Sequence, residues 1–319
     1  MLKKLKELEP YIGNTPIVKL ENDYINLFAK LEYHNLMNNI KARTAYNILK
    51  SAIERGDITE QSTVIESSSG NLAVSLAILC KKIGIRFIPV IDSNINPAYE
   101  NILRILSHQV VKITNRDETG GFLISRLEKV QELCKEISTS YWTNQYENDD
   151  NFLAHYEGTG KELADYFNRL DYAFIGVGTG GTISGISQRL KKTFPQIKVI
   201  AVDSEGSLIF QNVPRKRYLP GIGSSIKPSI LKHALIDDVI HVEEVRAIEG
   251  CHELLNKHSI FAGASSGSVY FAVQEYFQKV HFSTKPNVVF LCPDSGMPYT
   301  DTVYNQEWVN WLKIQLQHL

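Results

Sequence analysis

The residues of this sequence best suited to chemistry are one lysine and three turns rich in glycine, serine and threonine. Lys41 lies in the segment Asn-Asn-Ile-Lys-Ala-Arg, residues 38–43, where asparagine is a natural cap for the start of a helix. A lysine amine that is buried and neutral can act as a nucleophile and then as a base. Because an isolated lysine is most often a solvated surface group, the case for Lys41 depends on the three turns.

The first turn is dense in glycine and lies between a predicted strand and a predicted helix. The strand is expected over residues 172–176 and the helix over residues 183–192, and the turn between them contains Gly178, Thr179, Gly180, Gly181 and Thr182. Glycine lets the backbone approach an anion closely, and the free N–H groups at the start of a helix stabilise its charge. Close packing alone does not require so many glycines and threonines in succession. We therefore predict a phosphate site here.

The same turn also fits a different cofactor. Gly176, Gly178 and Gly181 satisfy the G-x-G-x-x-G pattern of dinucleotide-binding folds, and Asp203 ends the next predicted strand. A nicotinamide-dependent dehydrogenase places a ribose-binding acid about 20 residues after these glycines, which is close to the position of Asp203. The turn alone leaves open which phosphate is bound.

Two further turns offer hydroxyl groups at predicted strand ends. One follows the strand predicted over residues 63–65, precedes a helix that runs to about residue 82, and contains Ser67, Ser68, Ser69, Gly70 and Asn71. Hydroxyls, backbone N–H groups and an amide suit a carboxylate, although an ordinary helix cap is an equally good interpretation. The third turn, residues 262–267, contains Ser265 and likewise offers hydroxyl groups at a predicted strand end.

The elements that must position these residues alternate between helix and strand periodicity. After a helical face that ends at Gly56, the first series has strands over residues 63–65, 86–91 and 110–113 and helices over residues 99–106 and 122–137. A second series begins near Asn151, with strands over residues 172–176, 198–203 and 239–242. This order predicts an α/β fold with open, mostly parallel twisted sheets covered by helices. Ligands of such sheets bind beyond the carboxyl ends of strands, so we expect a site between two domains, with a boundary at residues 144–151.

The composition favours a small-molecule partner. The chain has 319 residues, 43% of them hydrophobic, which is enough for a sizeable core and for two domains. Its 34 basic and 35 acidic residues create no net field that would attract nucleic acid or an anionic membrane. No apolar run approaches the roughly 18 residues of a membrane span, and no histidine, cysteine and carboxylate spacing indicates a metal. Four separated cysteines and a start without the apolar core of a signal peptide predict a cytoplasmic location.

Together, Lys41 and the three turns resemble the fold-type II pyridoxal 5′-phosphate (PLP) enzymes, particularly the cysteine synthase family. The resemblance extends from Ile-Gly-Asn-Thr-Pro at residues 12–16 to Pro-Asp-Ser-Gly at residues 293–296, which is nearly the whole chain. It implies a large PLP-binding domain of residues 1–38 and 150–319 and a small mobile domain of residues 39–149 with the substrate-carboxylate loop. It also implies that PLP lies in the cleft between them, and that a homodimer acts on amino-acid substrates.

The resemblance implies a role for each turn. Lys41 would form the internal aldimine with PLP, and residues 178–182 would hold the cofactor phosphate. Asn71 would hydrogen-bond the 3′-oxygen of PLP, and Ser265 would face its pyridine nitrogen. The groups that would bind the substrate α-carboxylate are Ser68, Ser69, Asn71 and Gln145, while Gly221 and Gly223 would line the site near the substrate amine.

The implied reaction is a β-replacement on an O-activated L-serine. The freed lysine would remove the α-proton, loss of the β-substituent would leave an aminoacrylate intermediate, and a second substrate would add to its β-carbon. A serine at the pyridine nitrogen, unlike a carboxylate, does not favour a protonated ring. Elimination should then compete well against transamination, and we expect little transaminase activity.

Four segments are more similar to the synthases that make a 2,3-diaminopropionate precursor for siderophore or related pathways. They are residues 141–146, 202–210, 219–223 and 260–268. O-phospho-L-serine as substrate and the amine of L-glutamate as nucleophile are therefore the expected pair. A cysteine synthase that uses O-acetylserine or O-phosphoserine with sulfide stays open as an alternative, because the turn at residues 178–182 resembles that group more. A non-catalytic binder with the same fold is a third possibility.

A basic cluster and one cysteine receive less specific interpretations. Arg215, Lys216 and Arg217 could receive a phosphate leaving group or an acidic second substrate, but a solvated basic loop is the preferred interpretation. Cys292 follows the apolar strand predicted over residues 288–291 and is expected to be a small buried residue rather than a nucleophile.

The surroundings of the lysine differ from the family pattern. Leu36, Asn39 and Ala42 occupy the places where the family usually has proline, a small residue or serine, and aspartate. His34 and His155 are single histidines near motifs, which are more often packing or surface residues than catalytic ones, so we assign them no role.

Overall fold

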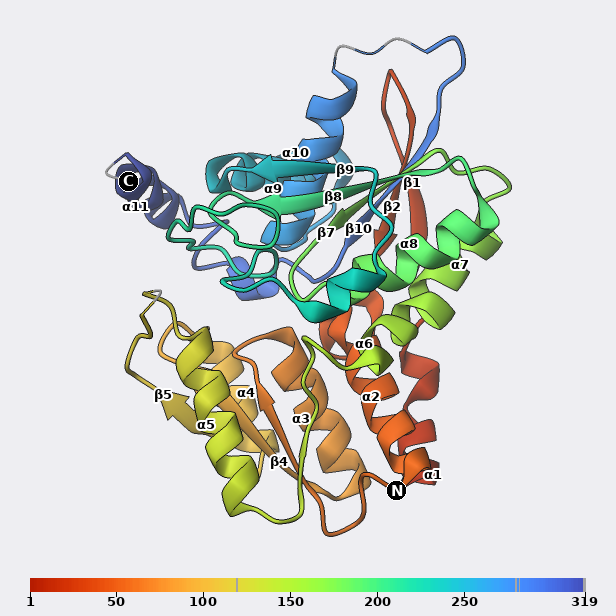
Figure 1. Cartoon of the computed structure of the whole chain (residues 1–319). Coiled ribbons are helices and arrows are strands. Elements are labelled where there is room, and N and C mark those ends of the chain that lie inside the picture. Colours follow the sequence, from red (N-terminus) through yellow and green to blue (C-terminus); the bar gives the residue numbers. More distant parts are fainter. Residues whose placement is uncertain (119, 279, 281, 318–319) are drawn as a thin grey trace.

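The computed structural model describes residues 1–118, 120–278, 280 and 282–317 and contains two sheets, each covered by helices (Figure 1). The larger sheet has the order β1-β2-β10-β7-β8-β9, and its neighbouring strands are parallel except β1 and β2. Its strands are β1 (Ile17–Leu20), β2 (Asn26–Leu31), β7 (Tyr172–Gly176), β8 (Lys198–Ser204), β9 (Asp238–Val242) and β10 (Asn287–Cys292). This sheet therefore joins the beginning of the chain to its second half.

The smaller sheet comes entirely from the middle of the chain. It has the order β5-β4-β3-β6, all parallel, and consists of β3 (Thr63–Ser67), β4 (Arg86–Asp92), β5 (Val111–Ile113) and β6 (Ser140–Trp142). Its connecting helices are α3 (Asn71–Ile83), α4 (Pro97–Leu106) and α5 (Leu123–Glu136). We refer to this sheet with α3, α4 and α5 as the small unit, and to the larger sheet with its covering helices as the large unit. The predicted α/β class, with open and mostly parallel sheets, is confirmed.

Strand β10 shows why the central strands are apolar on both faces. Val288 and Phe290 belong to a core that includes Val269 of α10 (Ala264–Phe277), whereas Val289 and Leu291 belong to a separate core with α8 (Gly181–Thr193). Helices thus cover both faces of the larger sheet, and successive side chains of a buried strand must all be apolar. The remaining helices of this unit are α7 (Gly160–Tyr166), α9 (Glu244–His258) and α11 (Gln306–Leu316).

Helix α2 (Lys41–Arg55) lies at the junction of the two units and packs on α3 and on α6 (Asp149–Ala154). Its predicted apolar face is buried, and the helix ends at Gly56, whose φ of +83° is the left-handed conformation that favours glycine. The short helix α1 (Leu2–Lys6) packs on α2 and α3 through the fully buried Leu5. Helix α2 is therefore held by neighbours from both parts of the chain.

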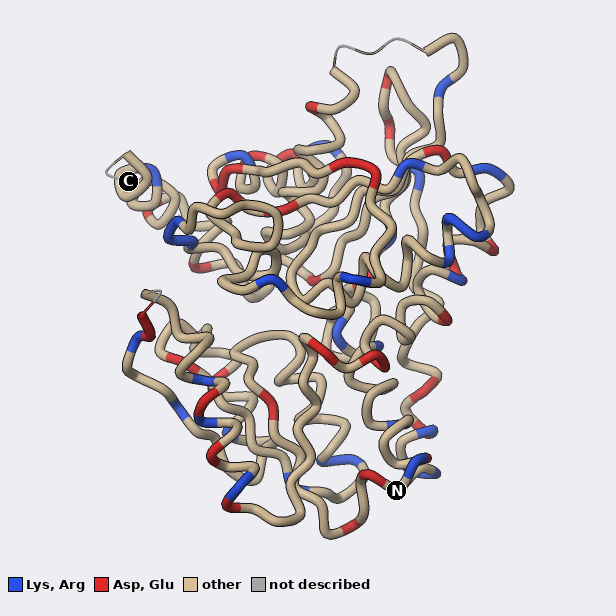
Figure 2. Tube along the Cα trace, in the orientation of Figure 1, with Lys and Arg blue, Asp and Glu red and all other residues tan. Residues whose placement is uncertain are grey.

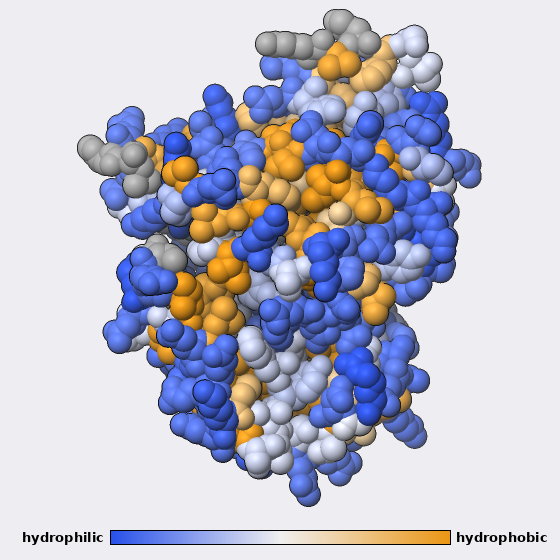
Figure 3. Space-filling view, in the orientation of Figure 1, coloured by the Kyte–Doolittle hydropathy of each residue, from blue (hydrophilic) through white to orange (hydrophobic). Residues whose placement is uncertain are grey.

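Along the Cα trace of both units, Lys and Arg are interspersed among Asp and Glu (Figure 2). In the space-filling view, the outline is indented on the left where the two units meet (Figure 3). Within the described residues, no helix is both long enough and apolar enough to cross a bilayer. All four cysteines are free, and Cys292 is fully buried at the end of β10, as predicted.

Candidate active site

Lys41 is the first residue of α2, and the backbone at this point is tied to both units. The N–H of Ile40 donates to the carbonyl of Pro293 at 2.7 Å, just beyond β10. The N–H of Lys41 donates to Oδ1 of Asn39 at 2.9 Å, and the same oxygen accepts a hydrogen bond from Ser75 of α3 at 3.1 Å. Asn39, which departs from the family pattern, is fully buried and therefore fixes the start of the lysine helix.

The side chain of Lys41 is partly buried, and burial lowers the pKa of its ammonium to about 8. Removing water from the charged form disfavours it, so the neutral amine becomes accessible near neutral pH. A neutral amine is the form that a nucleophile or a base requires. The structure thus provides surroundings that favour a neutral Lys41 amine, which the sequence allowed but did not establish.

Competitive labelling of the apoprotein with acetic anhydride over a pH series checks this pKa. The reactivity of Lys41 should rise as the pH rises through about 8, because only the neutral amine reacts. Mass spectrometry of the peptide that contains Lys41 measures the label, with the unfolded protein as the reference. A midpoint near about 10.4, the ordinary value for lysine, would contradict the lowered pKa.

The glycine-dense turn links β7 to α8, as predicted. Gly180 has a φ of +88°, and α8 begins at the next residue. A Cβ at Gly181 would lie 2.3 Å from Oδ1 of Asn151, so only glycine fits there. Oγ1 of Thr179 is buried and has no hydrogen-bond partner among the described residues. Together with the first N–H groups of α8, which lack partners within the helix, this hydroxyl makes the turn suited to an anion.

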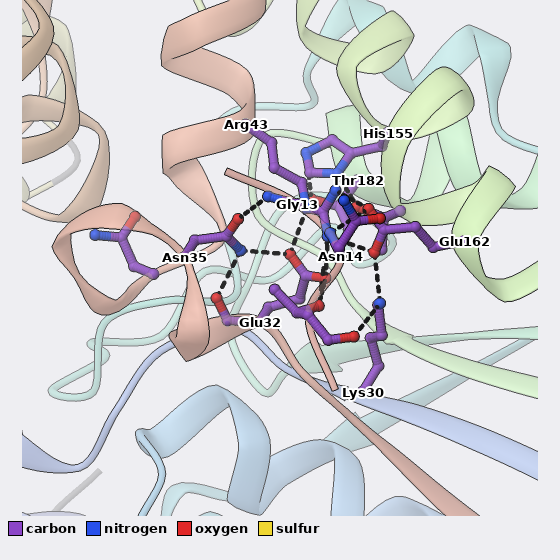
Figure 4. Close-up of polar contacts among 12 residues, drawn as sticks. Gly13, Asn14, Lys30, Glu32, Asn35, Arg43, His155, Glu162 and Thr182 are labelled. Atoms are coloured by element: carbon purple, nitrogen blue, oxygen red, sulfur yellow. Dashed lines mark hydrogen bonds and ion pairs between the residues drawn. The ribbon is translucent and has the colours of Figure 1, made fainter. Parts of the chain in front are cut away.

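His155, to which the sequence assigned no role, contacts this turn (Figure 4). Its Nε2 lies 3.3 Å from Oγ1 of Thr182 and 3.2 Å from Oγ1 of Thr44 in α2, and its Nδ1 lies 3.0 Å from Oγ1 of Thr159. Burial, and then the charge of Lys41, holds the pKa of His155 well below its ordinary value. The histidine is therefore neutral. It begins the π-helical turn η4 (His155–Thr159), a feature that hydrophobic periodicity does not reveal.

The serine-rich turn connects β3 to α3, and Ser69 in this turn forms hydrogen bonds with two charged residues. Its Oγ donates to Oδ2 of Asp92 at 2.8 Å and accepts from the N–H of Asp92 at 3.0 Å. Nη1 of Arg126 in α5 also donates to this oxygen, at 3.1 Å. Within the described residues, the hydrogen bond that Oγ of Ser68 accepts is a longer one, 3.4 Å, from the N–H of Gly70. The hydroxyl of Ser68 is thus less engaged than that of Ser69.

Gln145 lies beside this turn, in the segment after β6. Its Nε2 is 3.4 Å from Oε1 of Glu66 and 3.4 Å from the carbonyl of Ser67. Glu66 is fully buried and also accepts a hydrogen bond from Thr143, while burial raises its pKa to about 7. The backbone carbonyl of Gln145 accepts from Nδ2 of Asn151 at 2.7 Å. A carboxyl group of β3 therefore orients the Gln145 amide.

Asn71, the first residue of α3, is held from both units. Its Nδ2 donates to Oδ2 of Asp294 at 2.8 Å, and its Oδ1 accepts from the hydroxyl of Tyr99 at 2.6 Å. Tyr299 donates to the same oxygen of Asp294 at 2.8 Å. Asp294 is 2% exposed, and burial raises its pKa. These bonds decide which way the Asn71 amide faces, and the amide keeps a further N–H and a further lone pair for a ligand.

Ser265 lies in the first turn of α10, next to the loop that contains Gly221. A Cβ at Gly221 would lie 3.3 Å from the Cβ of Ser265, and the φ of Gly221 is +109°. The N–H of Gly223 donates to the carbonyl of Val177 at 2.7 Å. A Cβ at Gly178 would lie 3.2 Å from the carbonyl oxygen of Gly221. The fold therefore brings the glycine-dense turn, the Gly221 loop and Ser265 together.

A buried ion-pair network braces α2 two residues after Lys41 (Figure 4). Arg43 donates through Nε to Glu32 at 2.7 Å and through Nη1 to Glu162 at 2.6 Å. Nζ of Lys30 lies 2.5 Å from the second oxygen of Glu162. Burial alone would raise the pKa of Glu162, but Arg43 and then Lys30 lower it to about 2. The charges of two acidic and two basic side chains thus compensate one another inside the protein.

Hydrogen-bonding contacts link three of the predicted segments to the start of α2. His155 connects α2 to the glycine-dense turn, and Asn39 and Pro293 connect the lysine segment to α3 and β10. An amine of lowered pKa, a buried hydroxyl without a partner and a glycine-lined turn at a helix start together fit PLP. Lys41, Thr179 and the N-terminal turn of α8 are the groups that could hold it.

The fold and this site define a PLP-dependent enzyme. Residues 8–294 match the family model described as pyridoxal-phosphate dependent enzyme, and the chain belongs to this family. Its cofactor is PLP and its reaction class is β-replacement. The family match decides between the two cofactors that the sequence left open, in favour of PLP over a nicotinamide dinucleotide.

Two curated relatives are each 40% identical to this chain and are named N-(2-amino-2-carboxyethyl)-L-glutamate synthase. The protein from Ralstonia nicotianae aligns over 310 residues, which are 95% of this chain and 91% of that protein. The protein from Cupriavidus metallidurans aligns over 304 residues, which are 93% of this chain and 89% of that protein. The resemblance that the sequence motifs indicated is confirmed.

Solved structures share the whole fold. An O-acetylserine-dependent cystathionine β-synthase from Helicobacter pylori has a TM-score of 0.86 at 27% identity, covering 93% of this chain and 98% of that one. A hydrogen sulfide-producing enzyme from Fusobacterium nucleatum has a TM-score of 0.84 at 30% identity, covering 92% of this chain and 98% of that one. The architecture is therefore that of fold-type II PLP enzymes.

Proposed function

We propose that this enzyme replaces the phosphate of O-phospho-L-serine with the α-amine of L-glutamate. The products would be inorganic phosphate and N-(2-amino-2-carboxyethyl)-L-glutamate, a precursor of 2,3-diaminopropionate. The observation that supports this pair of substrates most is the 40% identity, over 95% of the chain, to synthases named for that product. Siderophore biosynthesis is the pathway class in which such a product would be used.

In this proposal, the turns around Lys41 hold the cofactor. Lys41 would attach PLP covalently, residues 178–182 would bind its phosphate, Asn71 would hydrogen-bond its 3′-oxygen, and Ser265 would face its pyridine nitrogen. When bound, PLP supplies an electron sink for the α-carbon of the amino acid. The neutral His155 holds the hydroxyl of Thr182 at 3.3 Å without adding a positive charge to the turn.

The residues of the chain position the substrate and move its α-proton. With its pKa lowered to about 8, Lys41 can take the α-proton as a neutral amine and return it to the same carbon. The hydroxyls of Ser68 and Ser69 and the amide of Gln145 bind the α-carboxylate, and Glu66 orients that amide. The loop that contains Gly221 and Gly223 lines the site near the substrate amine, and Gly221 lies beside Ser265.

Replacing Thr179 by valine tests whether the turn binds the cofactor phosphate. The hydroxyl has no partner in the described part of the chain, so its loss should leave the apoprotein at least as stable. Loss of a hydrogen bond to a charged phosphate should raise the Kd for PLP about 10-fold. Fluorescence titration gives the Kd, and thermal unfolding of the apoprotein gives the Tm. A lower Tm with an unchanged Kd would instead assign the hydroxyl to folding.

We also infer a small mobile domain of residues 39–149 and a larger PLP-binding domain of residues 1–38 and 150–319. The supporting observation is that β3 to β6 form one sheet, while β1 and β2 join β10 in the other. Closure of the small domain would bring Ser68 and Ser69 onto a substrate held near Ser265. A homodimer is expected, and light scattering of the purified protein would measure its mass.

A cysteine synthase that uses sulfide is the second candidate. It is favoured by the likeness to an O-acetylserine-dependent enzyme and to a hydrogen sulfide-producing enzyme. Assays of purified protein with O-phosphoserine or O-acetylserine, each against L-glutamate and sulfide, separate the two candidates. The proposal predicts phosphate release from O-phosphoserine that depends on L-glutamate, with the coupled product detected by mass spectrometry. Product formation with sulfide alone would reject it.

A further inference from the structure

The basic cluster that begins at Arg215 does not form one solvated loop. Arg215 is exposed and pairs with Glu205, with 3.3 Å between Nη1 and Oε2. Lys216 is also exposed, and its Nζ lies 4.5 Å from the ring centroid of Tyr218. Arg217, by contrast, is partly buried. The interpretation as a solvated loop therefore holds for Arg215 and Lys216 and fails for Arg217.

Arg217 lies against the loop that borders Ser265. A Cβ on Gly223 would lie 2.0 Å from Nη1 of Arg217, so the guanidinium occupies the space that a side chain at Gly223 would need. Nη2 donates to Oγ of Ser225 at 3.4 Å. Two residues before Gly223, a Cβ on Gly221 would lie 3.3 Å from the Cβ of Ser265. The cation is therefore at the edge of the candidate active site.

Arg217 forms no salt bridge with a carboxylate in the described part of the chain. The carboxylates that most raise its pKa are Asp203 and Glu244, and Oε1 of Glu244 already accepts from the N–H groups of Tyr218 and Leu219 at 2.6 Å each. Burial lowers the pKa of Arg217. A partly buried guanidinium without an ion-pair partner is costly, and an anionic ligand would offset that cost.

The phenol of Tyr146 lies in the field of two guanidinium groups, one from each unit. Burial raises its pKa, whereas Arg126 of the small unit and Arg217 of the large unit each lower it. Nε of Arg126 is buried and lacks a hydrogen-bond partner among the residues described. Each unit therefore contributes one cation near this phenol, and each cation can bind an anion.

We propose that Arg217 binds a carboxylate of the incoming amino acid and thereby selects a dicarboxylic acceptor such as L-glutamate. This inference rests on the proposed function, because it assumes an amino-acid acceptor. Arg126 hydrogen-bonds Ser69, on the side where the carboxylate of the first substrate is expected, whereas Arg217 lies beside Gly223 on the opposite unit. The planar guanidinium of arginine can hold a carboxylate with two parallel N–H bonds. The two arginines thus serve different anions.

Calorimetry on the PLP-loaded protein tests this assignment, with glutarate as the dicarboxylate probe and inorganic phosphate as the alternative anion. Arg217→Met should weaken glutarate binding by about 10- to 100-fold, the usual loss for a charge-assisted hydrogen bond. Phosphate binding should change by less than about threefold. Arg217→Lys should recover part of the affinity, because it keeps the charge without the planar fork. Arg215→Met, the matched control, removes the same charge from an exposed position and should leave both affinities unchanged.

Kinetics give a second readout in the same variants. In Arg217→Met, the KM for L-glutamate should rise by about 10- to 100-fold while kcat changes little, because the lost contact binds the ground state and the transition state alike. The rate with sulfide, which has no carboxylate, should equal that of the wild type. Unchanged absorbance of the bound PLP and an unchanged Tm would show that the variant is folded.

Unchanged glutarate binding in Arg217→Met would overturn the inference. So would the absence of glutarate binding by the wild type, or a loss of phosphate binding as large as the loss of glutarate binding. If the wild type binds glutarate through Arg217 but does not use L-glutamate, the proposed acceptor is wrong and the Arg217 site stands. If the wild type uses L-glutamate and Arg217→Met matches it, the Arg217 site is wrong and the proposed function stands.

Discussion

Replacement of Lys41 by alanine is expected to lower kcat for β-replacement by about 10³-fold or more. With the roles proposed for Lys41, the variant would lose both the covalent attachment of PLP and the amine that moves the α-proton. Lys41→Arg should be equally inactive, because a guanidinium keeps the charge but does not give up its proton near neutral pH. The measurement is steady-state release of phosphate from O-phospho-L-serine in the presence of L-glutamate.

The matched control for this variant is Lys192→Ala, which removes an exposed lysine near the end of α8 and should retain the kcat of the wild type. Thermal unfolding of each apoprotein separates a loss of chemistry from a loss of folding. A folded Lys41→Ala protein with kcat within about tenfold of the wild type would remove Lys41 from the mechanism.

Replacement of Arg43 by methionine is expected to lower the free energy of unfolding by about 3–5 kcal/mol, the usual cost of leaving a buried charge without its partner. The arginine is 4% exposed and pairs with both Glu32 and Glu162, of which Glu32 is fully buried. Methionine fills a similar length but satisfies neither carboxylate. Urea denaturation of the apoprotein measures the change.

Two further variants make the Arg43 prediction specific. Arg55→Met removes an arginine of the same helix whose side chain is 49% exposed and pairs with Asp57 and Asp150, and its loss should cost less than that of Arg43. Adding Glu162→Gln to Arg43→Met should restore part of the lost stability, because one of the two uncompensated carboxylates becomes neutral. Equal costs for Arg43→Met and Arg55→Met would contradict the role assigned to the network.

The same network predicts how stability depends on pH. Burial would raise the pKa of Glu162, but Arg43 and Lys30 outweigh it and lower the pKa to about 2, below the value of about 4.3 expected in the unfolded chain. A lowered pKa contributes stability that is fully present above the unfolded value and is lost as the pH falls towards the folded value. The wild type should therefore lose stability more steeply than Arg43→Met between about pH 5 and pH 2. Parallel curves for the two proteins would contradict this.

Much of the fold could be predicted because its signals are local. The apolar run of β7, the glycines after it and the helical spacing of α8 are adjacent in sequence, and all three elements were found where they were expected. Strand β3 continues to Ser67 instead of ending near residue 65, and α4 starts at Pro97, where Asn96 caps it through the N–H of Ala98. Such boundary differences depend on capping and pairing, which periodicity does not specify.

Strands β1, β2 and β6 were not predicted, for a physical reason. Strand β2 is in the interior of the larger sheet because it pairs with β10, more than 250 residues later, and nothing near β2 in the sequence encodes that partner. Strand β6 has only three residues, Ser140–Trp142, and forms by pairing with β3. Long-range pairing stabilises these strands more than their own composition does.

Prediction of the candidate site from the sequence was limited in the same way, because long-range contacts are not encoded locally. The turns assigned to the site could be identified from residue type, because glycine allows close backbone approach and serine and threonine supply hydroxyl groups wherever they are placed. His155, Arg217 and Asp294 could not, because their significance depends on burial and on contacts made across the two units. The sequence analysis favoured a solvated loop for Arg217, whereas its partial burial and its position beside Gly223 distinguish it from its two basic neighbours.

Borohydride reduction of the PLP-loaded protein, followed by peptide mapping, tests the central claim most directly. Reduction converts the linkage between PLP and a lysine into a stable pyridoxyl group that mass spectrometry can locate. We predict that the label is on Lys41 and that Lys41→Ala carries none, while Lys192→Ala is labelled like the wild type. A pyridoxyl group on a different lysine, or no label on a protein that binds PLP, would contradict the account.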